Sequence, residues 1–254
     1  MSNAHFFRVL VLGGVVAASV GDARPAEAQA ASSPQAPAVG ESAGMPVYIA
    51  PEPIHGEPAD LRRHNVPADV RGSGATLAAP VALAPDSVGC TISAQPTLYW
   101  YLGAPTGERL MFTFNDPNRS EPLVQADLRN EGAAGIHAIA LPQYGVRLQP
   151  GVEYDWSVAL VRDPDNRSKD IVASAYVRRV PPAADLQSRL AAAGAARSAH
   201  VYAHDGLWYD ALMVLSKRID TPPGSPDARV QRAALFEQIG LPEIAAAERS
   251  VTAK

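Results

Sequence analysis

The sequence predicts a mainly β fold with an added α part: an immunoglobulin- or fibronectin-like antiparallel β-sandwich followed by a C-terminal helical tail. Between about residues 91 and 180, six short runs alternate apolar and polar residues and are separated by turn residues, which is typical of such a sandwich. After Pro181-Pro182 the apolar residues recur at helical spacing instead. The expected segments are a signal peptide (1–30), a disordered Pro/Ala/Gly-rich leader (31–86), the sandwich (87–181) and the helical tail (182–254).

The N-terminus has the order of features that an export signal needs. Arg8 precedes an apolar run from Val9 to Val20, and the small-x-small site Ala28-Gln29-Ala30 follows. The apolar run is too short to span a bilayer, so we expect cleavage after Ala30, with Ala28 as second choice, and a mature chain without a membrane span. The alternative is a buried N-terminal helix. Export predicts a periplasmic or secreted protein.

The leader lacks any sustained periodicity, so we expect it to be largely disordered. One part of it is less uniform: Val47 to Ile49 could add an edge strand or dock on the domain. Four possible metal ligands follow in spacing that matches no known ligand pattern, and a solvated linker is the preferred interpretation: His55, Glu57, Asp60 and His64.

The runs of the predicted sandwich each place apolar side chains on one face. In the first two runs these are Leu98, Trp100 and Leu102, then Leu110, Phe112 and Phe114. The other runs cover 123–128, 135–141, 153–161 and 171–180. Two of the runs lead into near-identical Asp-Pro turns at Asp116 and Asp163, where Pro fixes a turn dihedral and Asp caps it.

The segment from Leu148 to Trp156 has the spacing of a tyrosine corner. A Pro-Gly turn precedes Tyr154, which stands at the start of an alternating strand. In such a corner the Tyr hydroxyl returns to the backbone just upstream, and this favours the immunoglobulin-like sandwich. The alternative is an ordinary Pro-Gly hairpin before a half-buried strand.

The helical tail contains an internal match at an offset of 34 residues, which is the tetratricopeptide period. The matched pairs are Gly206-Leu207 with Gly240-Leu241, Ala199 with Ala233, Tyr202 with Phe236 and Ala211 with Ala245. We therefore expect two helical hairpins forming a degenerate repeat, since Thr221-Pro222-Pro223 matches the terminal Pro of the repeat poorly. Two unrelated hairpins are the alternative, because Ala matches arise easily in an alanine-rich tail.

Several motifs together resemble a bacterial family, domain of unknown function 928, which occurs in cyanobacteria and other Gram-negative bacteria. They are Gly206-Leu-Trp-Tyr-Asp-Ala-Leu212, Pro96-Thr-Leu-Tyr-Trp-Tyr101, Tyr154-x-Trp156 with the block Asp163 to Asp170, and Ile239-Gly-Leu241. The family has no established activity, so the resemblance implies export and a cell-envelope setting. Many members carry a cysteine shortly before the Asp…Arg-Ser turn, where this chain has Val161 and Arg162, so a family disulfide is absent here.

Charge and cysteine content exclude some classes of protein. With 22 Lys and Arg against 26 Asp and Glu, the net charge is -4 and no basic cluster stands out, so nucleic acid is not an expected partner. Cys90 is the single cysteine and cannot form an internal disulfide. We expect it to be a small buried side chain.

Two groups of residues are candidate sites. His200 and His204 stand at i and i+4 beside Asp205 and are weak metal candidates. The Glu of a zincin motif is missing, so surface histidines are preferred and no metal or cofactor is expected. Trp208, Tyr209 and Asp210 are a candidate ligand or partner surface. The alternative is that Trp208 packs on the sandwich and Asp210 caps a helix.

No Ser-His-Asp arrangement, phosphate loop or metal motif is present, so no catalytic residue is assigned. The expected function is that of an exported, non-catalytic adaptor that binds an envelope protein. A carbohydrate- or peptide-binding module is the alternative, with Tyr99, Tyr101 and Tyr176 on its outer face. A metal-dependent hydrolase is less favoured, and the oligomeric state is not predicted.

Overall fold

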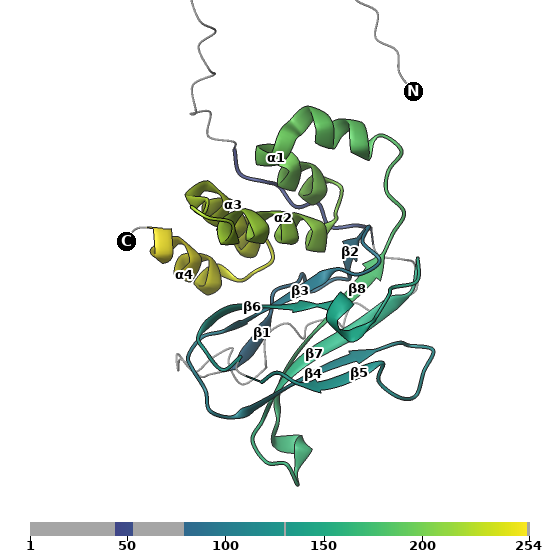
Figure 1. Cartoon of the computed structure of the whole chain (residues 1–254), viewed down its shortest axis with the longest axis vertical. Coiled ribbons are helices and arrows are strands. Elements are labelled where there is room, and N and C mark those ends of the chain that lie inside the picture. The colour runs from purple at the N-terminus through teal and green to yellow at the C-terminus, as the bar shows by residue number, and fades with distance from the viewer. Residues whose placement is uncertain (1–43, 53–78, 130, 253–254) are drawn as a thin grey trace, which may run out of the picture. The chain divides into compact units, whose positions relative to one another are not determined.

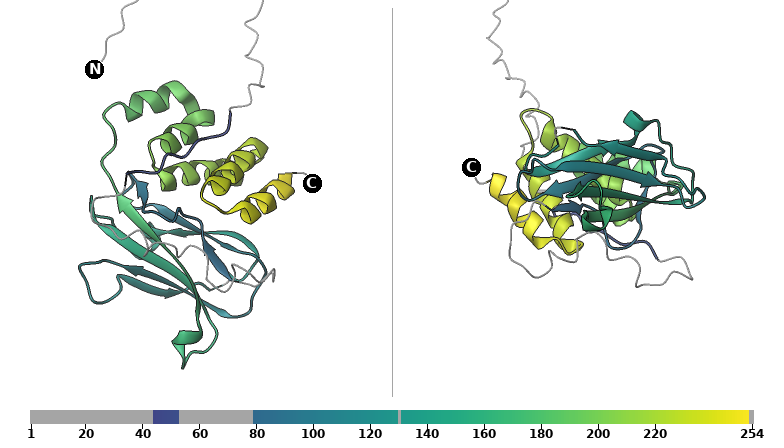
Figure 2. Two further views of the ribbon diagram at one scale, coloured as in Figure 1. Left: turned by 180° about the vertical axis from the view of Figure 1, so that it is seen from behind. Right: turned by 90° about the horizontal axis from the view of Figure 1, so that it is seen from below.

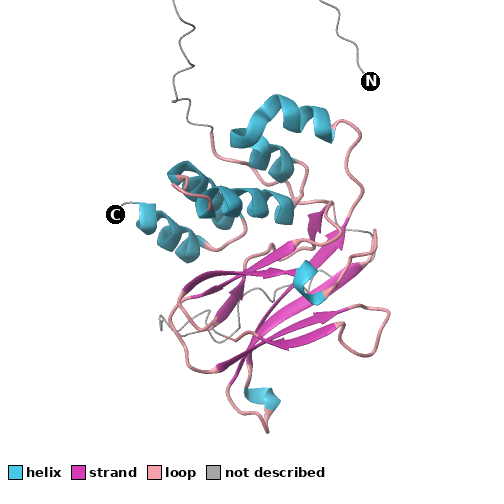
Figure 3. Cartoon of the chain, viewed as in Figure 1, coloured by secondary structure: helices cyan, strands magenta, loops and turns pink. Residues whose placement is uncertain are grey.

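The computed structural model describes residues 44–52, 79–129 and 131–252. The expected signal peptide, most of the leader and its four possible metal ligands (His55, Glu57, Asp60 and His64) lie outside these residues. Within them, a β-rich part is followed by four α-helices. Figure 3 draws the strands in magenta and the helices in cyan.

The strands form two sheets (Figure 1). The three-stranded sheet has the order β1 (Pro80–Ala82), β3 (Thr97–Leu102), β6 (Gly135–Ala140). The five-stranded sheet has the order β2 (Gly89–Thr91), β8 (Ile171–Arg179), β7 (Glu153–Val161), β4 (Arg109–Asn115), β5 (Val124–Asp127). Neighbouring strands are antiparallel except β2 and β8, which are parallel. Two short 3-10 helices follow strands, η3 (Leu141–Tyr144) and η4 (Arg167–Lys169).

The alternating residues of the sequence form the core between the sheets. On β3, Leu98, Trp100 and Leu102 are fully buried, and on β7 Trp156 and Val158 are as well. All six predicted runs are strands, with ends within about two residues of the expected positions. The alternation of apolar and polar residues in the sequence therefore predicted the position of each of these strands correctly.

The N-terminal boundary of the sheet region differs from the expectation. Strand β1 lies inside the segment 31–86 that was expected to be a disordered leader. Pro80 lacks an N–H donor, and β1 is an edge strand, where such a residue is tolerated. The pairing with β3, from Pro80 opposite Leu102 to Ala82 opposite Trp100, holds this short apolar segment in place.

The sandwich was also expected to be antiparallel throughout, and β2 corrects this. Gly89 to Thr91 run parallel to Val177 to Arg179 at the edge of the five-stranded sheet. Val180 N–H then donates to the Thr91 carbonyl at 2.8 Å, which continues the parallel contact beyond the end of β8.

The turn before β7 makes the hydrogen bond of a tyrosine corner. The Gln149 N–H donates to the Tyr154 hydroxyl at 3.1 Å, and Tyr154 is buried. The two Asp-Pro turns are also alike, because Asp116 Oδ1 accepts from Asn118 N–H at 2.9 Å and Asp163 Oδ1 accepts from Asp165 N–H at 3.1 Å.

Four helices follow the sheets: α1 (Leu186–His204), α2 (Trp208–Asp220), α3 (Pro226–Gln238) and α4 (Pro242–Thr252). Helix α1 is broken at Gly194, whose φ of 66° lies in the left-handed region. Helix α3 begins with a Ser225 cap, whose hydroxyl accepts from the Ala228 N–H at 3.2 Å. The helices gather on one side of the sheets, as the left view of Figure 2 shows, and α2 contacts β2 and β3. Among the described residues, none of the helices is long and apolar enough to cross a membrane.

The turns α1–α2 and α3–α4 have the same hydrogen bonds. After α1, Gly206 N–H donates to Ala203 and Leu207 N–H to Tyr202; after α3, Gly240 N–H donates to Glu237 and Leu241 N–H to Phe236. This is the Schellman arrangement, in which a glycine with positive φ ends a helix. Gly206 and Gly240 have φ of 71° and 79°. The 34-residue match in the sequence therefore marks equivalent turns.

Candidate functional site

The most specific sequence motif, Gly206 to Leu212, opens α2 where this helix meets the sheets; we call it the junction motif. Trp208 is fully buried, and its Nε1–H donates to the Leu83 carbonyl at 2.9 Å, just after β1. The motif therefore attaches α2 to the segment that follows the first strand.

Tyr209 makes a second attachment, to the five-stranded sheet. Its hydroxyl donates to the Tyr176 carbonyl on β8 at 2.9 Å and accepts from Trp156 Nε1–H on β7 at 2.9 Å. A Cβ at Gly89 would lie 2.6 Å from Cε2 of Tyr209. Glycine in β2 thus allows the ring to pass close to the strand.

Asp210 makes the third attachment, to the residues around the end of β2. Its Oδ2 accepts from the Ile92 N–H at 3.1 Å, and the carboxylate is also hydrogen-bonded by the Thr91 side chain. Burial raises the pKa of Asp210 to about 6, against the lowering effect of these hydrogen bonds. The carboxyl group therefore joins helix and sheet and does not face solvent.

The three residues expected as a ligand or partner surface are thus buried. Trp208, Tyr209 and Asp210 are 0%, 1% and 5% exposed. Their side chains are taken up by contacts between α2 and the strands, which is the structural alternative considered for them. They do not form an open lip for a sugar or a peptide.

A separate feature lies next to the junction motif: residues 44–52, an extended segment that we call the strap. In Figure 1 the strap is the purple segment, and it runs beside the helices. Ile49 N–H donates to the Ala203 carbonyl of α1 at 3.1 Å, and Gln238 of α3 bonds to the main chain of Pro46 and Tyr48. The strap therefore crosses from one helix to another without joining a sheet.

The Tyr48 ring is the main side-chain contact of the strap. It packs edge-on against Trp208, with ring centroids 5.0 Å apart and an interplanar angle of 72°. Gly206 is also close, since a Cβ there would lie 2.9 Å from the Ile49 carbonyl oxygen. The sequence left two options for residues 47 to 49, an added edge strand or docking on the domain. In the structure they dock, and the surface that they contact is formed by the helices.

The comparisons with known proteins place this architecture in a family. A model described as Domain of Unknown Function (DUF928) matches residues 66–249. The chain belongs to this family. The DUF928 match contains the eight strands of the described residues and the junction motif, whereas the strap precedes it. A comparison with curated proteins gave no match.

Stability of this DUF928 domain is expected to depend on pH through Asp210. The carboxyl of an unfolded Asp titrates near 3.8, and that of folded Asp210 near 6, so between these values the folded state binds more protons. Raising the pH from below 3.8 to above 6 therefore lowers the contribution of Asp210 to the free energy of unfolding by about 3 kcal/mol. Asp210→Asn keeps an acceptor for the Ile92 N–H and does not titrate.

Urea unfolding of both proteins between about pH 4 and pH 7 measures this effect, because groups shared by the two proteins cancel in the difference. The stability of Asp210→Asn relative to the wild type should rise with pH. A difference that is constant across the interval, or that falls, would contradict the assignment of a raised pKa to Asp210.

Cys90 lies in a buried cluster below the helices, with Leu186 and Leu207. It is 2% exposed, and Arg178 Nη2 lies 3.8 Å from its Sγ. Burial raises the pKa of the thiol in spite of the opposing effect of Arg178, which also pairs with Glu153 at 2.7 Å. The expectation of a small buried side chain is met.

The weak metal candidates in the DUF928 domain are engaged in other contacts. Two nitrogens of Arg189 bond to the two carboxylate oxygens of Asp205, at 2.7 and 2.5 Å, and lower the pKa of that group. His200 Nε2 bonds to the Gly44 carbonyl of the strap. His204 Nδ1 lies 3.6 Å from Asp205. The described residues contain no group of three or more His, Cys, Asp and Glu side chains arranged to hold a metal ion.

The aromatic residues expected on an outer face do not form one row. Tyr99 and Tyr101 are on β3 of the three-stranded sheet, and Tyr176 is on β8 of the five-stranded sheet. Tyr99 is only 7% exposed and is hydrogen-bonded with Ser216 of α2, so a helix covers it. The arrangement required for a carbohydrate-binding face is therefore missing at Tyr99.

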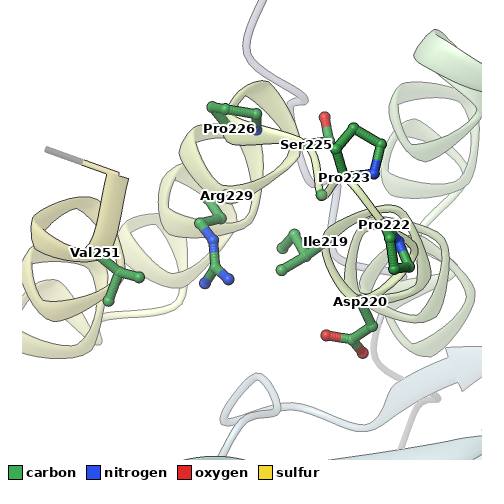
Figure 4. Close-up of a pocket in the computed structure, with 9 residues that line it drawn as sticks. Ile219, Asp220, Pro222, Pro223, Ser225, Pro226, Arg229 and Val251 are labelled. Atoms are coloured by element: carbon green, nitrogen blue, oxygen red, sulfur yellow. The ribbon is translucent and has the colours of Figure 1, made fainter. Parts of the chain in front are cut away.

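A pocket of about 340 Å³ lies at the far end of α2 and was not foreseen from the sequence (Figure 4). It is bordered by the loop between α2 and α3, the start of α3 and Val251 near the end of α4. Arg229 at its wall lies 3.4 Å from Glu248, and the Ser225 hydroxyl caps α3. Arg229 and Ser225 thus already have partners within the protein. The strap is therefore the better-defined binding feature.

Proposed function

We propose that this protein is an exported, non-catalytic component of the cell envelope, periplasmic or secreted in a Gram-negative bacterium, and that it acts as a protein-interaction adaptor. One observation supports the adaptor role most directly. The helices hold an extended peptide segment, the strap, by hydrogen bonds to its main chain. A surface that binds one extended segment in this way is suited to bind another.

The proposal includes the finer architecture of the two parts. We assign an immunoglobulin-like topology to the sheets, supported by the tyrosine corner at Tyr154. We assign a degenerate tetratricopeptide-like repeat to the four helices, supported by the matching turns at Gly206 and Gly240. Helical repeats of this kind bind partners along a surface shared by successive units, and the strap contacts both α1 and α3.

The proposed partner is an envelope protein. Export is supported by the order of charged, apolar and small residues in 1–30, and the net charge of -4 without a basic cluster disfavours nucleic acid. A carbohydrate-binding module and a metal-dependent hydrolase remain less favoured, because Tyr99 is covered and Asp205 is paired with Arg189.

Cell fractionation combined with photocrosslinking tests the proposal. The full chain is expected in the envelope fraction, with a mature N-terminus at Ala31. A photoreactive residue in place of Val47, which is 62% exposed on the strap, is expected to give a discrete protein adduct. The same residue in place of Val172, 43% exposed on β8, is the matched control and should give none.

Two results would contradict this proposal. A mature protein that retains Met1 in the cytoplasm would exclude export. Equal crosslinking from positions 47 and 172 would show that the strap side of the helices is no more a contact surface than the outer face of the five-stranded sheet.

A further inference from the structure

The helices recognise the strap mainly through its backbone. Gln238 Nε2 donates to the Pro46 carbonyl at 2.9 Å, and Gln238 Oε1 accepts from the Tyr48 N–H at 2.8 Å. One amide side chain thus binds both main-chain groups that flank Val47. This two-point contact requires an extended backbone and does not depend on the side chain between the two groups.

Two further main-chain bonds extend this contact along the strap. Ile49 N–H donates to the Ala203 carbonyl at 3.1 Å, and the Gly44 carbonyl bonds to His200 Nε2. The bonds therefore run from Gly44 to Ile49, and they are available to any extended peptide that has a main-chain N–H, and so no proline, at the positions of Tyr48 and Ile49. We call the residues of the helical part that form this surface the strap site: His200, Ala203, Gly206 of the α1–α2 turn, Trp208 and Gln238.

Side chains of the strap alternate between the helices and solvent. Pro46 is buried and Tyr48 packs on Trp208, whereas Met45, Val47 and Ile49 are 49%, 62% and 47% exposed. An extended chain points successive side chains to opposite sides, so two anchors two residues apart face the same surface. The chemistry that the strap site selects is therefore Pro-x-aromatic in an extended segment whose contacting residues, 44–49 in the strap, are uncharged.

The fit of the strap to its site is incomplete. The Tyr48 hydroxyl is buried and has no hydrogen-bond partner among the described residues. Burial accordingly raises the pKa of Tyr48 well above its usual value. A buried hydroxyl without a partner weakens binding, and phenylalanine has the same ring without this group. A segment with Phe at this position is better suited to the site than the strap itself.

We propose that the strap site binds an extended, uncharged Pro-x-Phe or Pro-x-Tyr segment of a partner protein, and that the strap is the competitor that occupies this site within the same chain. This inference rests on the proposed adaptor function and names the chemistry of its partner. A segment tethered in the same chain meets its site at an effective concentration that commonly reaches the millimolar range. A partner must therefore displace the strap, and its affinity for the site increases when the binding of the strap is weakened.

Binding of synthetic peptides to the purified full chain tests the proposal. The probe is a fluorescent peptide with the sequence of residues 44–52, and a second probe has Phe in place of Tyr at the position of residue 48. Tyr48→Ala weakens the strap, and we expect this variant to bind the first probe about tenfold more tightly than the wild type does, because the tethered competitor is lost. The Phe probe is expected to bind more tightly still.

Two further variants locate the binding. Val47→Ala changes an exposed strap side chain and should leave affinity at the wild-type level. Adding Gln238→Ala to Tyr48→Ala removes both main-chain contacts of the amide and should abolish binding. Because Tyr48→Ala also removes packing on Trp208, thermal unfolding with and without probe is measured in parallel, and the probe should raise the melting temperature of this variant.

Three outcomes would overturn the proposal. Tyr48→Ala that binds no probe, or binds it no more tightly than the wild type, would show that the strap is a fixed part of the fold. Unchanged affinity after Gln238→Ala would place binding elsewhere. Concentration-dependent dimers of the wild type, absent in Tyr48→Ala, would make a second copy the occupant. Peptide binding uses purified protein only, so its failure is distinct from a failure of export or crosslinking in cells.

Discussion

Trp156→Ala is expected to lower the free energy of unfolding by about 3 to 5 kcal/mol, as does truncation of other fully buried aromatic residues. Trp156 is 0% exposed in the middle of β7, where it pairs with Phe114 of β4 and Ala175 of β8. Its Nε1–H also donates to Tyr209 of α2 at 2.9 Å. The substitution therefore removes core packing and one attachment of the helices at the same time.

Urea unfolding followed by both circular dichroism and fluorescence is the measurement. Trp156→Phe is the control, since it keeps one ring in the core while it removes the bond to Tyr209 and the rest of the indole, so a smaller loss is expected. Because Trp156 packs between the sheets and also bonds to α2, the unfolding transitions followed by circular dichroism and by fluorescence should shift together in Trp156→Ala. Helices that keep their wild-type transition while the sheets unfold earlier would contradict this coupling.

Glu248→Ala is expected to have an effect of similar size, about 3 to 5 kcal/mol, because it leaves a buried charge without its partner. Arg232 and Glu248 are 5% and 6% exposed, and Arg232 Nη2 lies 2.6 Å from Glu248 Oε1. Arg232 Nη1 also donates to the Ser216 hydroxyl at 2.9 Å. This network joins α4, α3 and α2, and Ser216 connects it to Tyr99 on β3.

The surface pair Arg249–Glu237 provides a matched control. It joins the same two helices, α4 and α3, but its side chains are 40% and 46% exposed. Arg249→Ala should therefore change stability far less than Glu248→Ala, since exposed pairs are screened by solvent. Replacing Arg232 and Glu248 together by apolar residues of similar size should recover much of the loss. Equal effects of Glu248→Ala and Arg249→Ala in denaturant unfolding would refute the buried network as the cause.

The strands that could be predicted from the sequence are those whose periodicity is carried by large side chains. Leu98-x-Trp100-x-Leu102 specifies both a strand and its inward face. Strands β1 and β2 each have three residues, too few to show a period, and they consist of small residues and proline. Their position is decided by pairing with β3 and β8, which are distant in the sequence. Local sequence patterns do not indicate which distant strand will pair with such a short segment.

The sequence singled out the start of α2 but left two environments open for it, a ligand surface and a packing contact with the sheets. Trp208, Tyr209 and Asp210 are residue types found both in binding sites and at helix–sheet contacts. Their burial depends on Leu83, Tyr176 and other groups that the sequence does not place beside them. In the sequence alone, Asp210 has the position of an exposed carboxylate in the first turn of a helix. Only the structure shows that the Ile92 N–H donates to it.

The contact between the strap and α3 sets the order in which the protein can complete its fold. Tyr48 and Gln238 are 190 residues apart in the sequence, and a ribosome makes the chain from its N-terminus. Residues 44–52 are therefore synthesised early, yet their site is incomplete until α3 has been made and packed against α2. Contacts of such large sequence separation form slowly. A chain that ends before Gln238 contains the strap but only part of its site, so full seating of the strap requires a chain that extends past this residue.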